Sequence, residues 1–164
     1  ELSQRILKNR IRDRAKALLP YVDKAKLNDD QRISGDYRSA TVAQLLGQNP
    51  SCVFKTLVAV GASKRNYVFV IPVLCELDRK KAAKAVGEKS VELIPVKELL
   101  PLTGYIRGGC SPVGMKKMYP TYFDETCELY DEIAVSAGAR GHQMILSPIA
   151  LAELIGAEFA DLTK

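Results

Sequence analysis

The chain has 164 residues, of which 47% are hydrophobic, and carries a formal net charge of +5. This length and hydrophobic content predict one compact domain over residues 1–164. No apolar run approaches the roughly 18 residues of a membrane helix, so we expect a cytoplasmic protein without membrane contact. The four cysteines stand far apart without partnering histidines, which argues against zinc and disulfides and predicts reduced thiols.

Basic residues form several short clusters. They would suit a polyanionic partner, but clusters of this size are also typical of solvated helix faces and turn tips, so charge alone leaves both interpretations open. The clusters are Lys64-Arg65, Arg79-Lys80-Lys81, Lys116-Lys117 and the run from Arg5 to Lys16.

The N-terminal part of the chain predicts two helices separated by a polar loop. Apolar residues recur near a helical period from Leu2 to Val22, which predicts a basic amphipathic helix. Residues 23–36 are polar and are expected to form a loop. A second helix is expected from about Ser39 to Gly47, since glycine is favoured at helix C-termini.

The middle of the chain changes to an extended pattern. Residues 53–60 and 67–73 are rich in β-branched and aromatic side chains, which predicts two strands joined by a hairpin. A basic helix is expected within residues 77–86, with Asp78 as its N-cap and Gly87 as its terminator. A short strand over residues 91–94 and a helical turn over residues 95–100 follow.

The last third begins with a turn-rich segment over residues 103–117. Because strands and helices follow one another without regular βαβ alternation, the pattern predicts an α+β fold with a mixed sheet. The elements expected after the turn-rich segment are strands near 119–123, 132–136 and 142–146, a helix over 148–155 and an edge strand over 158–162.

Several common catalytic arrangements are missing from the sequence. His142 is the only histidine, and a lone histidine is more often structural than catalytic, which disfavours Ser-His-Asp and Cys-His chemistry. No P-loop, dinucleotide-binding fingerprint or H-E-x-x-H motif occurs. We therefore expect no cofactor and no metal.

Two features are suited to holding a substrate. The glycines between Gly108 and Gly114 would let backbone N–H groups approach a carbonyl, a phosphate or an oxyanion, although such a run also forms ordinary surface turns. Lys55 lies in an apolar strand on the face shared with Val53 and Leu57. Its ammonium group either reaches a cleft or extends to solvent from an edge strand.

Three motifs follow one another along the chain. They are Phe54-Lys55-Thr56-Leu57, then Thr103-Gly104-Tyr105 with Gly108-Gly109-Cys110-Ser111-Pro112-Val113-Gly114-x-Lys116-Lys117, then Ser136-Ala137-Gly138-Ala139-Arg140-Gly141. Their order and spacing resemble the YbaK family of tRNA-editing deacylases over about residues 36–164, which leaves residues 1–35 as an atypical basic segment. The Ser-Pro-x-Gly-x-Lys-Lys extension is most similar to the branch that deacylates cysteinyl-tRNA(Pro).

The resemblance implies a single α+β domain with a mixed, partly barrel-like sheet and flanking helices. The family's strand lysine corresponds to Lys55, beside Thr56, and would lie near the terminal adenosine or its phosphate. Backbone amides of the family's glycine loop would hold the aminoacyl carbonyl and ester. That loop corresponds to Gly108, Gly109, Cys110, Ser111 and Pro112.

The resemblance also implies a mechanism without a protein nucleophile. In the cysteine-specific branch the substrate's own thiol attacks its ester carbonyl, and orienting the two groups is worth up to about 7–11 kcal/mol of the barrier. With another amino acid, water would attack instead, helped by a tRNA hydroxyl. We expect that Cys110 is not a nucleophile, since its place in the loop suits backbone contact.

Further site residues and partners follow from the same resemblance. Some family members place an Asp after the Arg-Gly pair, where this chain has His142-Gln143, and Gln143 would line the pocket. Lys116, Lys117 and Arg140 are expected to contact tRNA phosphates. The expected partners are tRNA(Pro) and prolyl-tRNA synthetase, and the expected assembly is a monomer. Deacylation of Ala- or Ser-charged tRNA, and a non-catalytic tRNA- or synthetase-binding module, are the alternatives.

Overall fold

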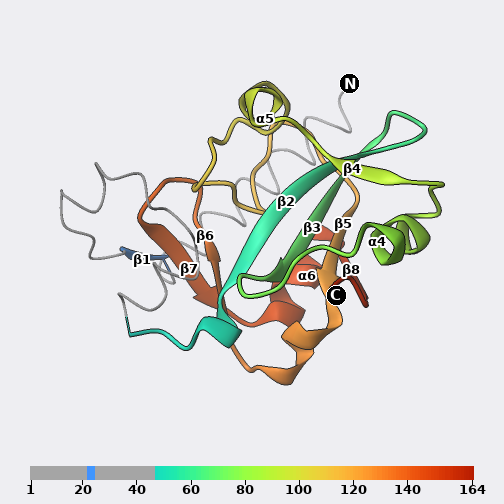
Figure 1. Cartoon of the computed structure of the whole chain (residues 1–164). Helices are drawn as coiled ribbons and strands as arrows, with labels where there is room; N and C mark the ends of the chain where they lie inside the picture. The colour runs from blue at the N-terminus through green and yellow to red at the C-terminus, as the bar shows by residue number, and fades with distance from the viewer. Residues whose placement is uncertain (1–21, 25–46) are drawn as a thin grey trace.

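The computed structural model describes residues 22–24 and 47–164, and its strands form two sheets (Figure 1). The larger sheet has the strand order β4-β2-β3-β5-β8. Strand β2 is antiparallel to β3 and β4, whereas β5 is parallel to β3 and β8, so this sheet is mixed. Its strands are β2 (Phe54–Gly61), β3 (Asn66–Pro72), β4 (Val91–Leu93), β5 (Thr121–Asp124) and β8 (Glu158–Ala160).

The smaller sheet is antiparallel and has the order β1-β7-β6. It consists of β1 (Val22–Lys24), β6 (Ile133–Ser136) and β7 (His142–Leu146). An isolated parallel bridge between Val53 and Ala134 joins β6 to the start of β2. Within the described residues the two sheets meet at this bridge and do not close into a barrel. The α+β prediction with a mixed sheet is confirmed.

Strand β1 lies where the sequence predicted the end of a helix and the start of a loop. Val22 pairs with Met144 and Lys24 with His142, so that prediction was wrong for residues 22–24. Local apolar spacing contains no information about a distant strand edge, and pairing with such an edge overrides local propensity. The remainder of the predicted N-terminal helix and loop, and the helix predicted from Ser39, lie outside the described residues.

Three helices flank the sheets, and no helix of the described part is long and apolar enough to span a membrane. They are α4 (Arg79–Val86), α5 (Val96–Thr103) and α6 (Pro148–Ile155). The predicted caps of α4 are confirmed, since Asp78 accepts hydrogen bonds from two backbone N–H groups and Gly87 adopts a left-handed conformation. Helix α5 is longer than the predicted turn, because it continues through Pro101 to Gly104.

Two short 3-10 helices complete the described part, η2 (Pro50–Cys52) and η3 (Glu125–Leu129). The sequence predicted neither η2 nor η3. The N-cap of η3 is Asp124, whose Oδ1 accepts hydrogen bonds from the backbone N–H and the hydroxyl of Thr126.

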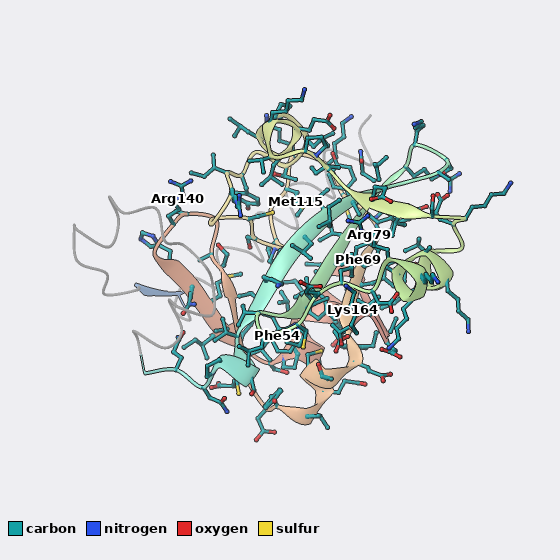
Figure 2. The ribbon with its side chains drawn as sticks, viewed as in Figure 1. Phe54, Phe69, Arg79, Met115, Arg140 and Lys164 are labelled. Atoms are coloured by element: carbon teal, nitrogen blue, oxygen red, sulfur yellow. The ribbon has the colours of Figure 1, made fainter. Side chains whose placement is uncertain are left out.

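The side chains of β2 alternate between two packed faces. Phe54 belongs to the core cluster that both sheets share, and Val58 on the same face packs in the cluster that contains Cys110. Ala59 points to the opposite face and packs with Phe69 in the cluster beneath α4 (Figure 2). The two faces of β2 therefore contact different parts of the chain.

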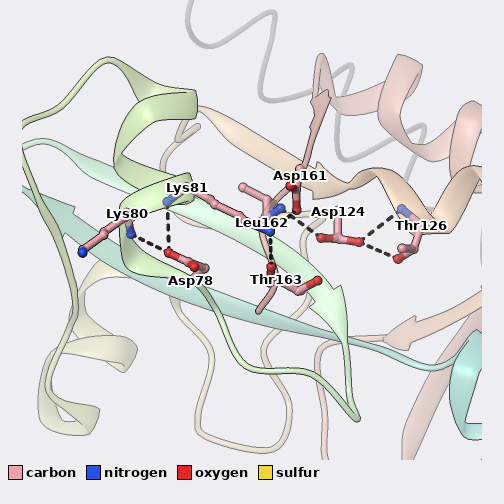
Figure 3. A network of polar contacts seen from close by, with 8 residues as sticks. All are labelled: Asp78, Lys80, Lys81, Asp124, Thr126, Asp161, Leu162 and Thr163. Carbon is pink, nitrogen blue, oxygen red and sulfur yellow. Dashed lines mark hydrogen bonds and ion pairs between the residues drawn. The ribbon is translucent and has the colours of Figure 1, made fainter.

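Buried Asp124 connects the end of β5 and the adjacent η3 to the distant C-terminal segment. Its side chain is 1% exposed, and its Oδ2 accepts a hydrogen bond of 3.1 Å from the backbone N–H of Leu162 (Figure 3). Its Oδ1 caps η3 through Thr126. The end of β5, η3 and the C-terminal segment thus depend on one carboxylate.

Replacing Asp124 with Ala should lower the free energy of unfolding by about 3 kcal/mol, because the buried N–H of Leu162 loses its acceptor and η3 loses its cap. Urea unfolding measures the change. Asp131→Ala, at an exposed position, is the control and should change the stability by less than about 0.5 kcal/mol. Equal, small effects of the two substitutions would contradict the structural role of Asp124.

Candidate functional site

Strand β2 changes partners along the edge that faces away from β3. Its start is bridged to Ala134 of β6, and its residues 59–61 pair with β4. Among the described strands, none pairs with residues 55–57 on this side, and we call these three residues the open edge. The open edge separates the larger sheet from the smaller one.

The backbone of Thr56 faces this open edge. Val58 O accepts a hydrogen bond of 3.1 Å from Ile94 N on the β4 side, and alternate residues of an antiparallel strand direct their N–H and C=O groups to the same side. The Oγ1 atom of Thr56 is buried and has no hydrogen-bond partner within the described structure. Within the described structure, Thr56 therefore has a backbone edge without a strand partner and a buried hydroxyl without a hydrogen-bond partner.

The predicted glycine-rich loop follows α5 and is held by its own backbone. Gly108 has a φ of 87°, and the N–H of Gly109 donates a hydrogen bond of 3.0 Å to Ile106 O. The hydroxyl of Ser111 accepts a hydrogen bond of 3.2 Å from Val113 N. Residues 109–113 are buried, so the predicted site loop is a packed turn rather than an exposed tip.

Tyr105 fixes the loop against the turn between β6 and β7. Its hydroxyl donates a hydrogen bond to Val113 O. A Cβ atom at Gly114 would lie 2.9 Å from the hydroxyl oxygen, and one at Gly138 would lie 3.0 Å from the ring. Burial raises the pKa of Tyr105, and proximity to Cys110 adds to this, so the phenol remains a donor.

The loop and the β6–β7 turn also pack backbone to backbone. A Cβ atom at Gly109 would lie 3.2 Å from the Cα of Ala139 and from Arg140 N. Arg140 Nε donates a hydrogen bond of 2.9 Å to Arg107 O, and Figure 2 shows Arg140 at the outer end of the hairpin. Two of the three sequence motifs therefore form one structural unit.

Lys55 projects from the face of β2 opposite Thr56. Val53 and Ala134 are bridged in parallel and pack in one cluster, and two residues further along each strand are Lys55 and Ser136. Since side chains two residues apart point to the same face, Lys55 and Ser136 share this face. The structure thus places the predicted lysine beside the strand that leads into the β6–β7 turn.

The ammonium group of Lys55 is partly buried and makes a hydrogen bond of 3.3 Å to Val73 O. Burial lowers its pKa, and the nearby Cys75 and Glu76 partly offset this effect. The loop residues Cys110 and Val113 instead pack on the Thr56 face of β2. Lys55 and these buried loop side chains therefore lie on opposite faces of the strand.

Gln143 lies next to Ser136, because these two residues pair across β6 and β7. Lys55, Ser136 and Gln143 therefore follow one another on neighbouring strands. The Oε1 of Gln143 accepts a hydrogen bond of 2.7 Å from Gln48 Nε2, and the Oε1 of Gln48 is buried without a partner in the described structure. Gln48 was not predicted as a site residue, because it follows the predicted helix end at Gly47 and belongs to no motif. The side-chain amides of Gln48 and Gln143 thus form a polar pair beside Ser136.

Cys110 has the properties of a packed side chain. It is 7% exposed, and burial raises the pKa of its thiol to about 12. A thiolate is the nucleophilic form of cysteine, so this residue is unreactive near neutral pH.

The remaining predicted site residues lie at the periphery. Lys116 and Lys117 are exposed, and Lys116 N donates a hydrogen bond of 3.0 Å to Thr103 O, which places the pair beside the end of α5. His142 Nδ1 lies 3.3 Å from Arg140 O at the start of β7. No group of three or more potential metal ligands occurs among residues 22–24 and 47–164.

A family model described as the aminoacyl-tRNA editing domain matches residues 36–154, which is more than half of the chain. The protein EbsC of Enterococcus faecalis, named as a Cys-tRNA(Pro)/Cys-tRNA(Cys) deacylase, is 51% identical over 131 residues, which are 79% of this chain and 80% of that protein.

Two solved structures are similar to this chain in fold. A crystal structure described as a trans-editing enzyme for prolyl tRNA synthetase is 30% identical and superposes with a TM-score of 0.74, covering 87% of this chain and 85% of the other. The hypothetical protein APE2540 is 25% identical and has a TM-score of 0.76, covering 87% of this chain and 90% of the other.

Gly109→Ala should lower the free energy of unfolding by about 1–3 kcal/mol, because the new methyl group meets backbone atoms that have no free rotation. Urea unfolding measures this cost, and amide hydrogen exchange over residues 137–141 should accelerate. Gly87→Ala is the control, since a Cβ there meets no atom within 4 Å and costs only its left-handed φ, about 1–2 kcal/mol. If amide hydrogen exchange over residues 137–141 is unchanged in Gly109→Ala, the β6–β7 turn does not depend on its close contact with Gly109.

Proposed function

Because the chain belongs to the family of aminoacyl-tRNA editing domains, we propose that it is a trans-acting deacylase that cleaves the ester of mischarged tRNA, with Cys-tRNA(Pro) as its substrate. The 51% identity to a protein named as a Cys-tRNA(Pro)/Cys-tRNA(Cys) deacylase supports the choice of cysteine. The similarity to a structure described as a trans-editing enzyme for prolyl tRNA synthetase supports tRNA(Pro), and prolyl-tRNA synthetase as a partner.

The observation that carries this proposal is a loop of backbone groups without an activated nucleophile. The one thiol in the glycine loop is buried, and its pKa is raised to about 12. The sole histidine lies at the start of β7, and the groups that set the pKa of that thiol are its buried surroundings and Thr103. Such a site favours catalysis by positioning, in which the substrate supplies the attacking group.

In the proposed reaction the thiol sulfur of the cysteinyl group attacks the carbonyl carbon of its own ester. A carbon–sulfur bond forms, the carbon–oxygen bond to the ribose breaks, and the thiol proton passes to the ribose oxygen. The products are a cyclic thioester of cysteine and uncharged tRNA. Backbone N–H groups of residues 108–112 would hold the carbonyl oxygen as it gains negative charge.

Three further residues have proposed positioning roles. Lys55 would stabilise the phosphate or ribose of the terminal adenosine, and Thr56 would offer its unpartnered hydroxyl at the open edge. Gln143, already bonded to Gln48, would contact the amino acid and contribute to its selection. None of these roles requires a metal or cofactor.

The cleanest test uses tRNA(Pro) charged with Cys, Ala, Ser or S-methylcysteine. We expect fast deacylation of the Cys form and a loss of about 100-fold or more on S-methylation, since blocking the thiol removes the intramolecular attack. Single-turnover release of the amino acid measures the rates. Comparable rates for S-methylcysteine would show that water attacks, and faster release of Ala or Ser would change the assigned amino acid.

Cys110→Ala should retain the single-turnover rate within about threefold, because a side chain with so high a pKa does not act as a nucleophile. Lys55→Ala, measured beside it, should be slower by about tenfold or more if the ammonium group stabilises a charged substrate group. Abolished turnover in a folded Cys110→Ala protein would overturn the mechanism. Circular dichroism and thermal unfolding establish the fold of both variants.

A further inference from the structure

A basic hollow of about 290 Å³ is lined by residues of α4 and of the segment that leads into β4. Figure 1 shows where these two elements lie. We call the basic hollow the α4 hollow. Its charged lining residues are Arg79, Lys80, Lys84, Lys89, Glu88 and Glu92. Four cationic side chains thus face two carboxylates, and the proposed deacylase site uses none of these residues.

Both carboxylates of the α4 hollow are already engaged. Glu92 forms an ion pair with Arg79, with an N–O distance of 2.5 Å. Glu88 accepts a hydrogen bond of 2.8 Å from the hydroxyl of Tyr67 and further hydrogen bonds from Ser63. The carboxylates therefore neutralise only part of the positive charge.

The lysines of α4 fall into two groups. Lys81 is structural, because its ammonium group binds Asp161 at 2.9 Å and Thr163 O at 2.7 Å. Figure 3 shows the side chain of Lys80 pointing away from this network. In the described part of the chain, Lys80, Lys84 and Lys89 have no carboxylate within ion-pair distance. Their charges are available to a partner.

The α4 hollow lies on the side of the larger sheet from which Lys55 projects. Helix α4 packs through Ala82 and Ala83 on the cluster that contains Ala59 of β2. Ala59 and Lys55 are four residues apart in one strand, so their side chains point to the same face. A nucleic acid whose 3′ end reaches Lys55 would therefore have this helix on the same side of the sheet.

We propose that the α4 hollow binds phosphate groups of the tRNA backbone, an inference that rests on the proposed deacylase function. Ammonium groups are point charges suited to phosphate oxygens. A protein partner would need an apolar or aromatic anchor at the centre of its interface. The apolar side chains that line the α4 hollow are only those of Ala83 and Val91, and Val91 is 1% exposed.

The test is the triple variant Lys80→Gln, Lys84→Gln, Lys89→Gln, measured by binding of uncharged tRNA(Pro) over a series of salt concentrations. The slope of log K against log salt should become less steep by up to about 2.7, since each lost duplex phosphate contact removes about 0.9. The matched control replaces the same three lysines with Arg, which keeps the charge and should keep the slope. Hydrolysis of an RNA-free cysteinyl ester should be unchanged in both variants.

An unchanged slope and affinity in the Gln variant would overturn the proposal. Unchanged tRNA binding together with weaker binding to prolyl-tRNA synthetase would assign the α4 hollow to a protein partner and also overturn it. An equal loss in the Arg variant would show that the lysines act through the fold rather than through charge. Failure of the wild-type protein to cleave charged tRNA would count against the proposed function instead, because the binding experiment requires no catalysis.

Discussion

The change of partners along β2 is the constraint on which the rest of the structure depends. One edge of this strand cannot pair with β6 and β4 at the same positions, so the bridge at Val53 and the ladder at residues 59–61 leave the open edge between them. The two sheets diverge there while sharing one apolar cluster, to which Phe54 and Val135 both contribute. Among the described residues, this divergence leaves the backbone groups on one side of Thr56 without a strand partner, and the shared core keeps them in place.

The glycines of the site are explained by close approach as well as by dihedral angles. Gly109 lies against the backbone of Ala139, and both Gly114 and Gly138 leave room for Tyr105. The loop after α5 and the β6–β7 turn therefore interlock although about 30 residues separate them in the sequence. The proposed catalysis by positioning would need this rigidity, because displacing a reacting group by about 1 Å costs about 100-fold in rate. Burial of residues 109–113 supplies it.

Much of the described fold could be predicted from sequence because its signals are local. The cap at Asp78, the terminators Gly87 and Gly156 and the apolar runs of β2 and β3 each specify an element by themselves. Two of the elements that were missed, β1 and η3, depend on distant partners. Strand β1 exists through pairing with β7, and η3 through a carboxylate that also binds Leu162. For the candidate site, motif spacing predicted the loop, the turn and Lys55, but the Gln48–Gln143 contact joins residues 95 positions apart and has no sequence signal.

Some basic residues of the described chain pair with carboxylates, whereas others can bind a partner. The composition alone does not distinguish these two groups. Lys81, Arg79 and Lys164 each pair with a carboxylate, so they stabilise local contacts and contribute little long-range potential. Lys80, Lys84 and Lys89 line a hollow and have no such partner among residues 22–24 and 47–164. Paired charges hold two local segments together, whereas unpaired ammonium groups attract a polyanion and release its counterions. Adjacent lysines in one helix can therefore differ in function, and in α4 the difference between Lys80 and Lys81 is whether Asp161 lies within reach.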